Sequence, residues 1–174
     1  MKYEELQSNK VVKTKKHIEE NAKLLNNVIQ KIIKSYCKSL DDYVAFITDI
    51  LHDSEEPPTT AELEDFCMHL STDIYWASGM CEQLGIRDDI AKALYKETYN
   101  NARDNLDKGT VADKNTLAEL ESQHEYLVSV CYSRAYRIVK EKIENAQSLL
   151  QSCKKVLTHR ISEEEITRMD TYEN

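Results

Sequence analysis

The sequence predicts an all-α protein of five to six helices, a helical bundle with a long, coiled-coil-like helix at its C-terminal end. Glycine and proline are very scarce, with three and two among 174 residues, which disfavours a turn-rich β protein. Apolar residues recur at spacings of three and four, the period of an amphipathic helix. No segment shows the period of two that is typical of a strand.

The N-terminal part of the chain predicts two helices. The first carries a heptad-like stripe made up of Ile18, Ala22, Leu25, Ile29, Ile32 and Tyr36. Ser39 with Asp42 predicts the N-cap of the second, which must stop by Pro57–Pro58, since proline lacks the backbone N–H. The segment SEEPPTT is the clearest hinge. We therefore expect an N-terminal helical arm or hairpin (1–58) and a helical bundle (59–174), the alternative being one single domain.

Two further helices are predicted between this hinge and residue 109. Thr59 and Glu62 form an S/T-x-x-E capping box at the start of the third helix. Gly85 follows the last residue of that helix's apolar stripe, at the position where a left-handed glycine commonly ends a helix. A fourth helix is expected from about Asp88 to Gly109.

The remainder predicts one long helix and a short closing one. Gly109 is expected to end the preceding helix, and Thr110 with Asp113 caps the next. No glycine or proline follows, so a helical pattern of close to fifty residues would be roughly 75 Å long. A domain this small cannot cover such a rod, so it bends, breaks or is partly buried by another subunit. Ser162 with Glu165 predicts the cap of the closing helix.

Composition predicts a cytoplasmic protein with reduced thiols. No run of about twenty apolar residues is present, so no membrane span is expected, and the polar start MKYEELQSNK does not resemble a signal peptide. The cysteines are odd in number and widely spaced, without a C-x-x-C pair, which favours structural thiols over a zinc site or a nucleophile: Cys37, Cys67, Cys81, Cys131 and Cys153.

No motif of an enzyme is present: the chain has no Gly-rich phosphate loop, no G-x-S-x-G and no H-E-x-x-H. Glu121 and His124 have the E-x-x-H spacing of ferritin-like metal bundles, and Asp49 with His52 is a loose second copy. We expect Glu121 and His124 to point inward. The ligand set is incomplete, so a buried histidine hydrogen-bonded to the glutamate is the preferred interpretation. We expect no enzyme, metal or cofactor.

A basic, tyrosine-bearing helix suggests binding of single-stranded DNA. Between Tyr126 and Arg160, seven lysines and arginines face only two glutamates. Arg137, Lys140 and Lys155 fall on a flank away from the apolar stripe, with Tyr132 and Tyr136 at the edge of the stripe. Cations contact phosphates and rings stack on any base. The alternative is a solvated flank beside ordinary core tyrosines. The basic run from Lys10 to Lys16 supports the DNA hypothesis.

The net charge of −8 is unevenly distributed, and its acidic part suggests a protein partner. Residues 39–109 carry sixteen acidic and five basic side chains. An anionic face of this kind can occupy a basic groove on another protein, as nucleic-acid mimics do, although an ordinary solvated surface is the alternative. The candidate interaction residues lie around the hinge: Asp53, Glu55, Glu56 and Glu62.

The segment GTVADKNTLAELE, followed by a helix ending in LQSCKKVLTHRI, resembles small helical proteins encoded by bacteriophages. Within these it is similar to the recombination-mediator (UvsY-like) family, through the block Ala112–Lys114 and the basic helix after it. The similarity covers roughly the last fifty to sixty residues. The acidic middle and the extra length before Gly109 depart from the family pattern.

The resemblance implies a small homo-oligomer in the host cytoplasm that binds single-stranded DNA and helps to load a recombinase. The residues that match as phosphate contacts are Lys114, Arg134, Arg137 and Lys140. The first functional hypothesis is therefore a non-enzymatic, phage-type recombination mediator or accessory protein that binds single-stranded DNA and partner proteins. The alternative is an acidic interaction module, an inhibitor or adaptor of a partner such as a host defence nuclease.

Overall fold

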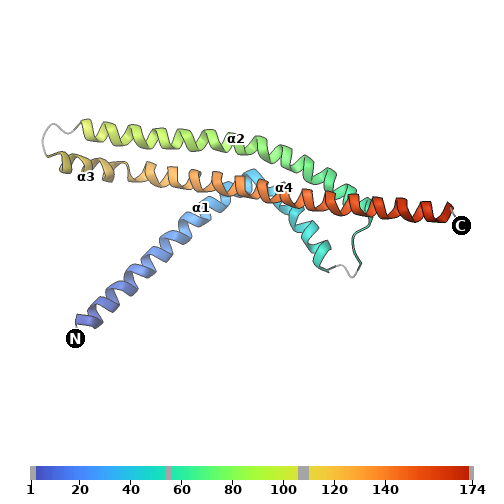
Figure 1. The fold of residues 1–174 in the computed structure, drawn as a ribbon. Helices are drawn as coiled ribbons and strands as arrows, with labels where there is room; N and C mark the ends of the chain where they lie inside the picture. Colours follow the sequence, from blue (N-terminus) through green and yellow to red (C-terminus); the bar gives the residue numbers. More distant parts are fainter. Residues whose placement is uncertain (1–2, 54–55, 106–109, 173–174) are drawn as a thin grey trace. The chain divides into compact units, whose positions relative to one another are not determined.

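The computed structural model describes residues 3–53, 56–105 and 110–172, and over these residues the chain is all-α. Its helices are α1 (Tyr3–Asp53), α2 (Thr60–Asp104), α3 (Val111–Glu121) and α4 (Gln123–Tyr172), in the order that Figure 1 shows along the chain. The predicted fold class is confirmed. The described helices number four rather than five to six, because three of the helix boundaries predicted from sequence are absent and one further break is present.

Two of these ends are replaced by contacts between helices. Ser39 lies within α1 instead of capping a helix, and its hydroxyl donates a hydrogen bond to Asp73 Oδ1 of α2 at 2.8 Å. Gly85 does not end a helix but lies within α2, which continues through it to Asp104. A Cβ at Gly85 would lie 3.2 Å from Cε2 of Tyr136, so the glycine makes room for that ring.

The third wrong end is at Ser162, which lies inside α4. Its hydroxyl donates to the Thr158 carbonyl at 3.1 Å, a bond within the helix rather than a cap. The long C-terminal rod instead breaks earlier, at Ser122, where the backbone has φ −91° and ψ 6°. Both the N–H and the buried hydroxyl of Ser122 donate to the Ala118 carbonyl, at 3.0 and 2.7 Å.

The predicted helix start at about Asp88 is wrong as well, because α2 is continuous there, but the starts at Thr59 and Thr110 are confirmed in detail. The Thr59 N–H donates to Glu62 Oε2 at 2.7 Å and the Glu62 N–H donates to Thr59 Oγ1 at 3.2 Å. Thr110 and Asp113 form the same box before α3, with N–H to carboxylate and N–H to hydroxyl distances of 3.0 and 3.3 Å. These hydrogen bonds lower the pKa of both carboxyl groups. Gly109 lies outside the described residues.

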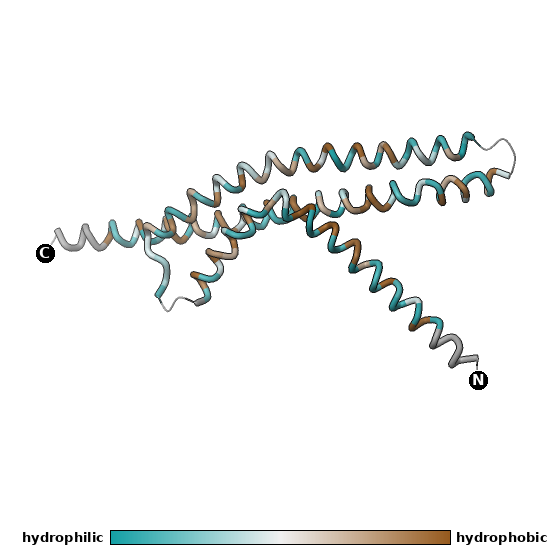
Figure 2. Tube along the Cα trace, turned by 180° about the vertical axis from the view of Figure 1, so that it is seen from behind, coloured by the Kyte–Doolittle hydropathy of each residue, from teal (hydrophilic) through white to brown (hydrophobic). Residues whose placement is uncertain are grey.

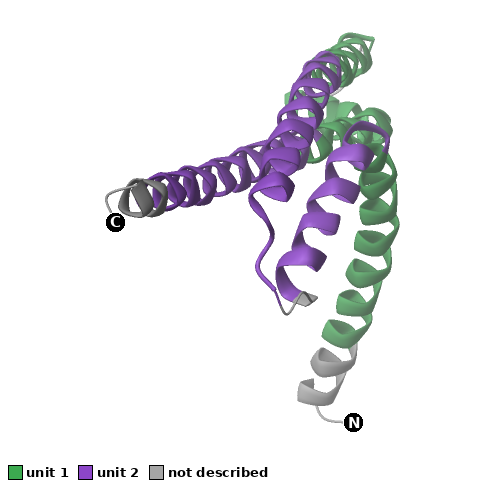
Figure 3. Cartoon of the chain, turned by 90° about the vertical axis from the view of Figure 1, so that its right-hand side faces the viewer, with its two compact units in different colours: residues 1–34, 87–135 green, residues 35–86, 136–174 purple. Residues whose placement is uncertain are grey.

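The chain divides into two compact units, shown in different colours in Figure 3. Unit 1 comprises Met1–Lys34 and Arg87–Ala135, and unit 2 comprises Ser35–Ile86 and Tyr136–Asn174. The long helices α1, α2 and α4 each contribute one stretch to each unit. Along every helix, Figure 2 shows hydrophobic residues recurring between hydrophilic ones, as amphipathic helices require.

Unit 2 is a three-helix unit with a core of large apolar side chains. Leu40 and Ile47 of α1, Leu70 and Leu84 of α2, and Val139 of α4 are at most 2 % exposed. Each fully buried aliphatic side chain of this kind contributes about 1.5–3 kcal/mol. Further buried apolar residues extend the same core: Phe66, Ile74, Ile143 and Leu150.

Unit 1 is built mainly around small residues. Ile29 and Ile33 of α1 are its large buried aliphatic side chains among the described residues. The other helices contribute buried alanines: Ala91, Ala102, Ala118 and Ala135. The buried polar side chains of the described part of the chain, Asp88, Ser122 and Ser129, also belong to this unit.

Candidate nucleic-acid interface

The basic residues of α4 in unit 2 lie on its solvent face, as the helical spacing predicts. Arg137, Lys140 and Lys155 are exposed, and so is Lys154. Arg137 and Lys155 lie opposite the buried residues of this part of α4, from Val139 to Cys153, and Lys140 and Lys154 lie to one side of them. The nearest counter-charge on this face is Glu141, whose Oε1 is 3.8 Å from Arg137 Nε in an exposed i,i+4 pair. Such a pair is worth only about 0.3–0.5 kcal/mol and leaves Arg137 accessible to a phosphate.

The two tyrosines are half-buried. Tyr136 in unit 2 packs its ring against Gly85 of α2. Tyr132 in unit 1 lines a cavity together with apolar residues of α2. Their rings therefore have packing roles inside each unit, and whether they also stack on bases stays a prediction.

The two remaining DNA-contact candidates lie in unit 1. Lys114 is half-buried on α3, and Arg134 is exposed on α4. Arg134 lines a groove of about 360 Å³ between α1 and α4, together with Ile18, Leu25 and Val130. The structure thus divides the seven predicted residues between the units, with Arg137, Lys140, Tyr136 and Lys155 in unit 2 and Lys114, Tyr132 and Arg134 in unit 1.

Two other cations of α4 are bound within unit 2. Lys142 Nζ is 2.6 Å from Asp41 Oδ1 of α1, and both side chains are only partly exposed. Arg160 Nη1 donates to the carbonyl of Pro58. The sequence places Lys142 and Arg160 in the same basic segment as Arg137. In the structure, however, Lys142 joins α4 to α1, and Arg160 joins α4 to the segment before α2.

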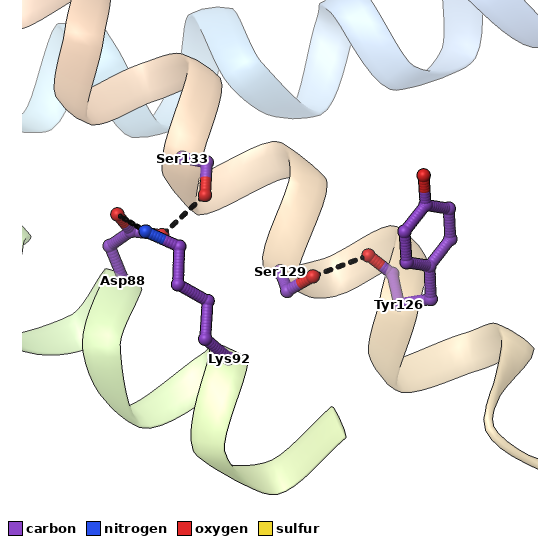
Figure 4. Close-up of polar contacts among 5 residues, drawn as sticks. All are labelled: Asp88, Lys92, Tyr126, Ser129 and Ser133. Atoms are coloured by element: carbon purple, nitrogen blue, oxygen red, sulfur yellow. Dashed lines mark hydrogen bonds and ion pairs between the residues drawn. The ribbon is translucent and has the colours of Figure 1, made fainter. Parts of the chain in front are cut away.

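A polar network in unit 1 was not predicted from the sequence. The buried Asp88 carboxylate accepts hydrogen bonds from Ser133 Oγ at 2.5 Å and from Lys92 Nζ at 2.7 Å (Figure 4). Ser129, one turn earlier on α4, donates to the Tyr126 carbonyl at 2.8 Å. The sequence feature that could have indicated this network is the pair Ser129 and Ser133, two serines four residues apart on the inner face of α4.

A cavity of about 480 Å³ lies between α2 and α4 in unit 1. Most of its lining is apolar, and Glu125 contributes a buried Oε2 atom without a hydrogen-bond partner in the structure. His124 also lines it. The lining residues are Arg87, Ile90, Ala91, Leu94, His124, Glu125, Val128 and Tyr132.

The E-x-x-H pair does not point inward as expected. Glu121 and His124 are both exposed, because the break at Ser122 turns Ala118 and Ser122 toward the core instead. Asp49 and His52 are exposed as well. Among the described residues, no three His, Cys, Asp or Glu side chains come together in a group able to hold a metal ion.

The predicted acidic interaction residues have different surroundings. Glu62 is engaged in the capping box of α2, and Glu56 is exposed. The side chains of Asp53 and Glu55 lie outside the described part of the structure. Exposed carboxylates do follow on the surface of unit 2: Asp42, Asp49, Glu64 and Asp65.

All five thiols are free, and four of them are buried. Burial, followed by the charge of Asp41, raises the pKa of Cys37 to about 11. Burial also raises the pKa of Cys67, Cys81, Cys131 and Cys153. Thiols held protonated at neutral pH are poor nucleophiles, which agrees with a structural role.

None of the described helices combines the length and the apolar character that a membrane span requires. Comparison of the chain with protein-family models, with curated proteins and with solved structures finds no match.

Proposed function

We propose that the chain is a non-enzymatic, phage-type recombination mediator or accessory protein. In this proposal it works in the host cytoplasm as a homo-oligomeric helical scaffold that binds single-stranded DNA and partner proteins. The observation that carries it is the exposed basic face of α4 in unit 2, with Arg137, Lys140, Lys154 and Lys155 directed to solvent. The cations that hold the unit together, Lys142 and Arg160, are separate from this face.

The chemistry of that face suits a polynucleotide backbone without sequence preference. If these four exposed cations each meet a phosphate and release a counterion, single strands should give a log Kobs against log salt slope of about −3. With the tyrosines half-buried, most of the affinity comes from charge. Binding should therefore be strongly salt-sensitive and nearly indifferent to base sequence.

The test is fluorescence anisotropy of a labelled single-stranded oligonucleotide at several salt concentrations. R137E/K140E should weaken binding and bring the salt slope to about half, because two of four phosphate contacts are lost. The matched control is K96E/R103E, an equal charge change at exposed positions of α2 in unit 1. Absence of binding at low salt, or equal losses in both variants, would contradict the proposal.

A second candidate is an acidic module that inhibits or bridges a protein partner. It is supported by α2 residues 60–86, which contain five carboxylates and no lysine or arginine. Polylysine serves as a probe of such a face: E64K/D65K should weaken its salt-sensitive complex with the chain. An unchanged complex would remove this candidate, and it would leave the DNA experiment unaffected.

A further inference from the structure

The outer part of α1 carries an apolar face that the chain itself leaves uncovered. Val11 and Ile18 are 66 % and 60 % exposed, Ala22 is exposed, and Leu25 is half-buried. Together with Lys15, whose side chain is 76 % exposed, they follow one another at spacings of four, three, four and three. That alternation is the seam of a coiled coil, with a lysine in one of its layers.

A second uncovered face of the same kind lies on α2 in unit 2. Tyr75 and Ile86 are 72 % and 61 % exposed, and Thr72, Gly79 and Glu82 between or beside them are exposed. These five residues follow one another at spacings of three, four, three and four, with a glutamate in one layer. Tyr75 and Ile86 are the large apolar side chains of this face, and exposed apolar side chains that share a helix face are a feature of interaction surfaces.

Gly79 leaves room for a partner on this face of α2. A glycine inside a helix destabilises it relative to alanine. Gly85 has a reason within the chain, because Tyr136 occupies the space of its missing side chain. A Cβ at Gly79 would meet nothing within 4 Å, so the packing of the chain itself does not require glycine there. A large side chain of another molecule fits into that gap.

The two seams are mirror images in spacing, so they match when the helices run antiparallel. Each layer then pairs a larger with a smaller side chain, two aliphatic ones, or opposite charges. The layers are Val11 with Ile86, Lys15 with Glu82, Ile18 with Gly79, Ala22 with Tyr75, and Leu25 with Thr72. In the alternative, parallel alignment with Lys15 opposite Glu82, residues 72–86 of α2 would lie against residues 5–19 of α1. Ala22 and Leu25 of the α1 seam would then have no partner, and only Val11 and Ile18 would remain as apolar contacts.

Charge favours this pairing over either face with itself. Residues 10–23 carry five lysines and two glutamates, whereas residues 60–86 carry five carboxylates and no lysine or arginine. Two copies of the α1 face would bring lysines together, and two copies of the α2 face would bring carboxylates together. Ile18, Ala22 and Leu25 of the α1 seam also line the groove between α1 and α4, and this groove adds a cation, Arg134, to the side that receives the acidic helix.

We infer that residues 11–25 of α1 dock antiparallel on residues 72–86 of α2 in a second copy of this chain, with Lys15 opposite Glu82. The inference rests on the homo-oligomer of the proposed function and names the surfaces that form it. A charged pair inside the seam sets register and partner, because an offset alignment places each charge against an uncharged residue.

The experiment is a charge exchange followed by sedimentation velocity over a concentration series. K15E and E82K should each weaken self-association about tenfold or more, since each variant places like charges in the seam. An equimolar mixture of K15E and E82K should regain the wild-type mass, because both contacts between unlike copies are then of opposite charge. Trp76, the one tryptophan of the chain and 66 % exposed beside the seam, should show a blue-shifted emission on association.

The matched control is K16E. Lys15 and Lys16 both form exposed i,i+4 pairs, with Glu19 at 3.8 Å and Glu20 at 3.9 Å. Their substitutions therefore change the charge and the local helix equally, but Lys16 lies away from the seam. K16E should retain association within about threefold of wild type, given the screening of exposed charges across the width of a helix.

Gly79→Leu tests the seam without charge. A Cβ at this position meets nothing within 4 Å in the chain itself and leucine improves helix propensity, so the thermal midpoint of the monomer should not fall. The same side chain collides with Ile18 of the second copy, and association should weaken about tenfold or more.

Failure of the mixture to regain the wild-type mass, or an oligomer unaffected by K15E, E82K and G79L, would overturn the seam while leaving the homo-oligomer of the proposed function in place. A wild-type chain that stays monomeric at all concentrations would overturn both. A blue-shifted Trp76 emission that is independent of concentration would mean that α1 docks on its own α2, which also overturns the inference. DNA binding is read separately, through Arg137 and Lys140.

Discussion

The two units bury different kinds of side chain. Unit 2 fills its interior with leucine, isoleucine, valine and phenylalanine from three helices. Unit 1 buries mainly alanine, and it holds the buried polar residues Asp88, Ser122 and Ser129 of the described chain. Both units expose large apolar side chains, among them Ile90 and Leu94 in unit 1 and Tyr75 and Ile86 in unit 2.

This difference indicates that the two units contribute unequally to the stability of the fold. Burial of apolar area is the main source of stability, so unit 2 supplies most of the free energy of folding. Unit 1 gains less from burial. A region with few buried apolar contacts opens more readily.

The largest expected effect comes from truncating a buried leucine of unit 2, with a half-exposed leucine of unit 1 for comparison. Leu70→Ala in unit 2 should lower the free energy of unfolding by about 2–5 kcal/mol, because the fully buried side chain leaves a cavity. Leu94→Ala in unit 1 should change it by less than about 0.5 kcal/mol, because Leu94 is 52 % exposed. Urea denaturation followed by circular dichroism measures both. Equal losses would break the distinction between the units.

An intermediate effect is expected from the polar network of unit 1. Asp88→Ala should cost about 1–3 kcal/mol, because it removes the acceptor of Ser133 and the counter-charge of Lys92. Asp89→Ala, at the neighbouring exposed position, is the control and should stay within about 0.5 kcal/mol. Hydrogen exchange should show the loss of protection around Ser133. If D88A and D89A behave alike, Asp88 does not organise unit 1.

A smaller effect is expected at the start of α3. Thr110→Ala should destabilise unit 1 by about 1 kcal/mol, since one half of the capping box is lost. Thr116→Ala on the same helix is the control, because its exposed hydroxyl only donates to the Ala112 carbonyl within the helix. Thermal unfolding measures the difference. An equal shift in both variants would show that the cap contributes nothing of its own.

The smallest effect concerns pH. Hydrogen bonds from Thr110 lower the pKa of Asp113 below its ordinary value of 3.8, so the folded state favours the charged carboxylate. Its contribution is present above that ordinary value and is lost as pH falls through the lower folded pKa. D113N should therefore have a lower melting temperature than wild type at pH 7, and the gap should shrink toward pH 2. A constant gap would exclude the carboxylate charge as its cause.

The sequence predicted correctly what depends on neighbours in the chain. The capping boxes at Thr59 and Thr110 need only residues three apart, and both formed. The exposed side of Arg137 and Lys140 follows from the period of one helix. For the same reason the fold class could be predicted from spacing and composition alone.

Features that depend on another helix were missed. Ser39 has the sequence context of a cap, but Asp73 of α2 offers its hydroxyl a better partner within a continuous helix. Gly85 has the context of a helix end, but it accommodates Tyr136. In the same way, the sequence around Lys142 does not predict its ion pair with Asp41. One sequence does not show which distant residues meet.

The pairing of Lys142 with Asp41 joins residues 101 positions apart in the chain, and both lie in unit 2. During synthesis at about 5–20 residues per second, α1 therefore waits roughly 5–20 s for α4 after leaving the ribosome. Until then Leu40 and Ile47 have only α2 to cover them. The newly made chain is thus exposed to aggregation or chaperone capture for seconds, and a slow step late in translation would lengthen that interval.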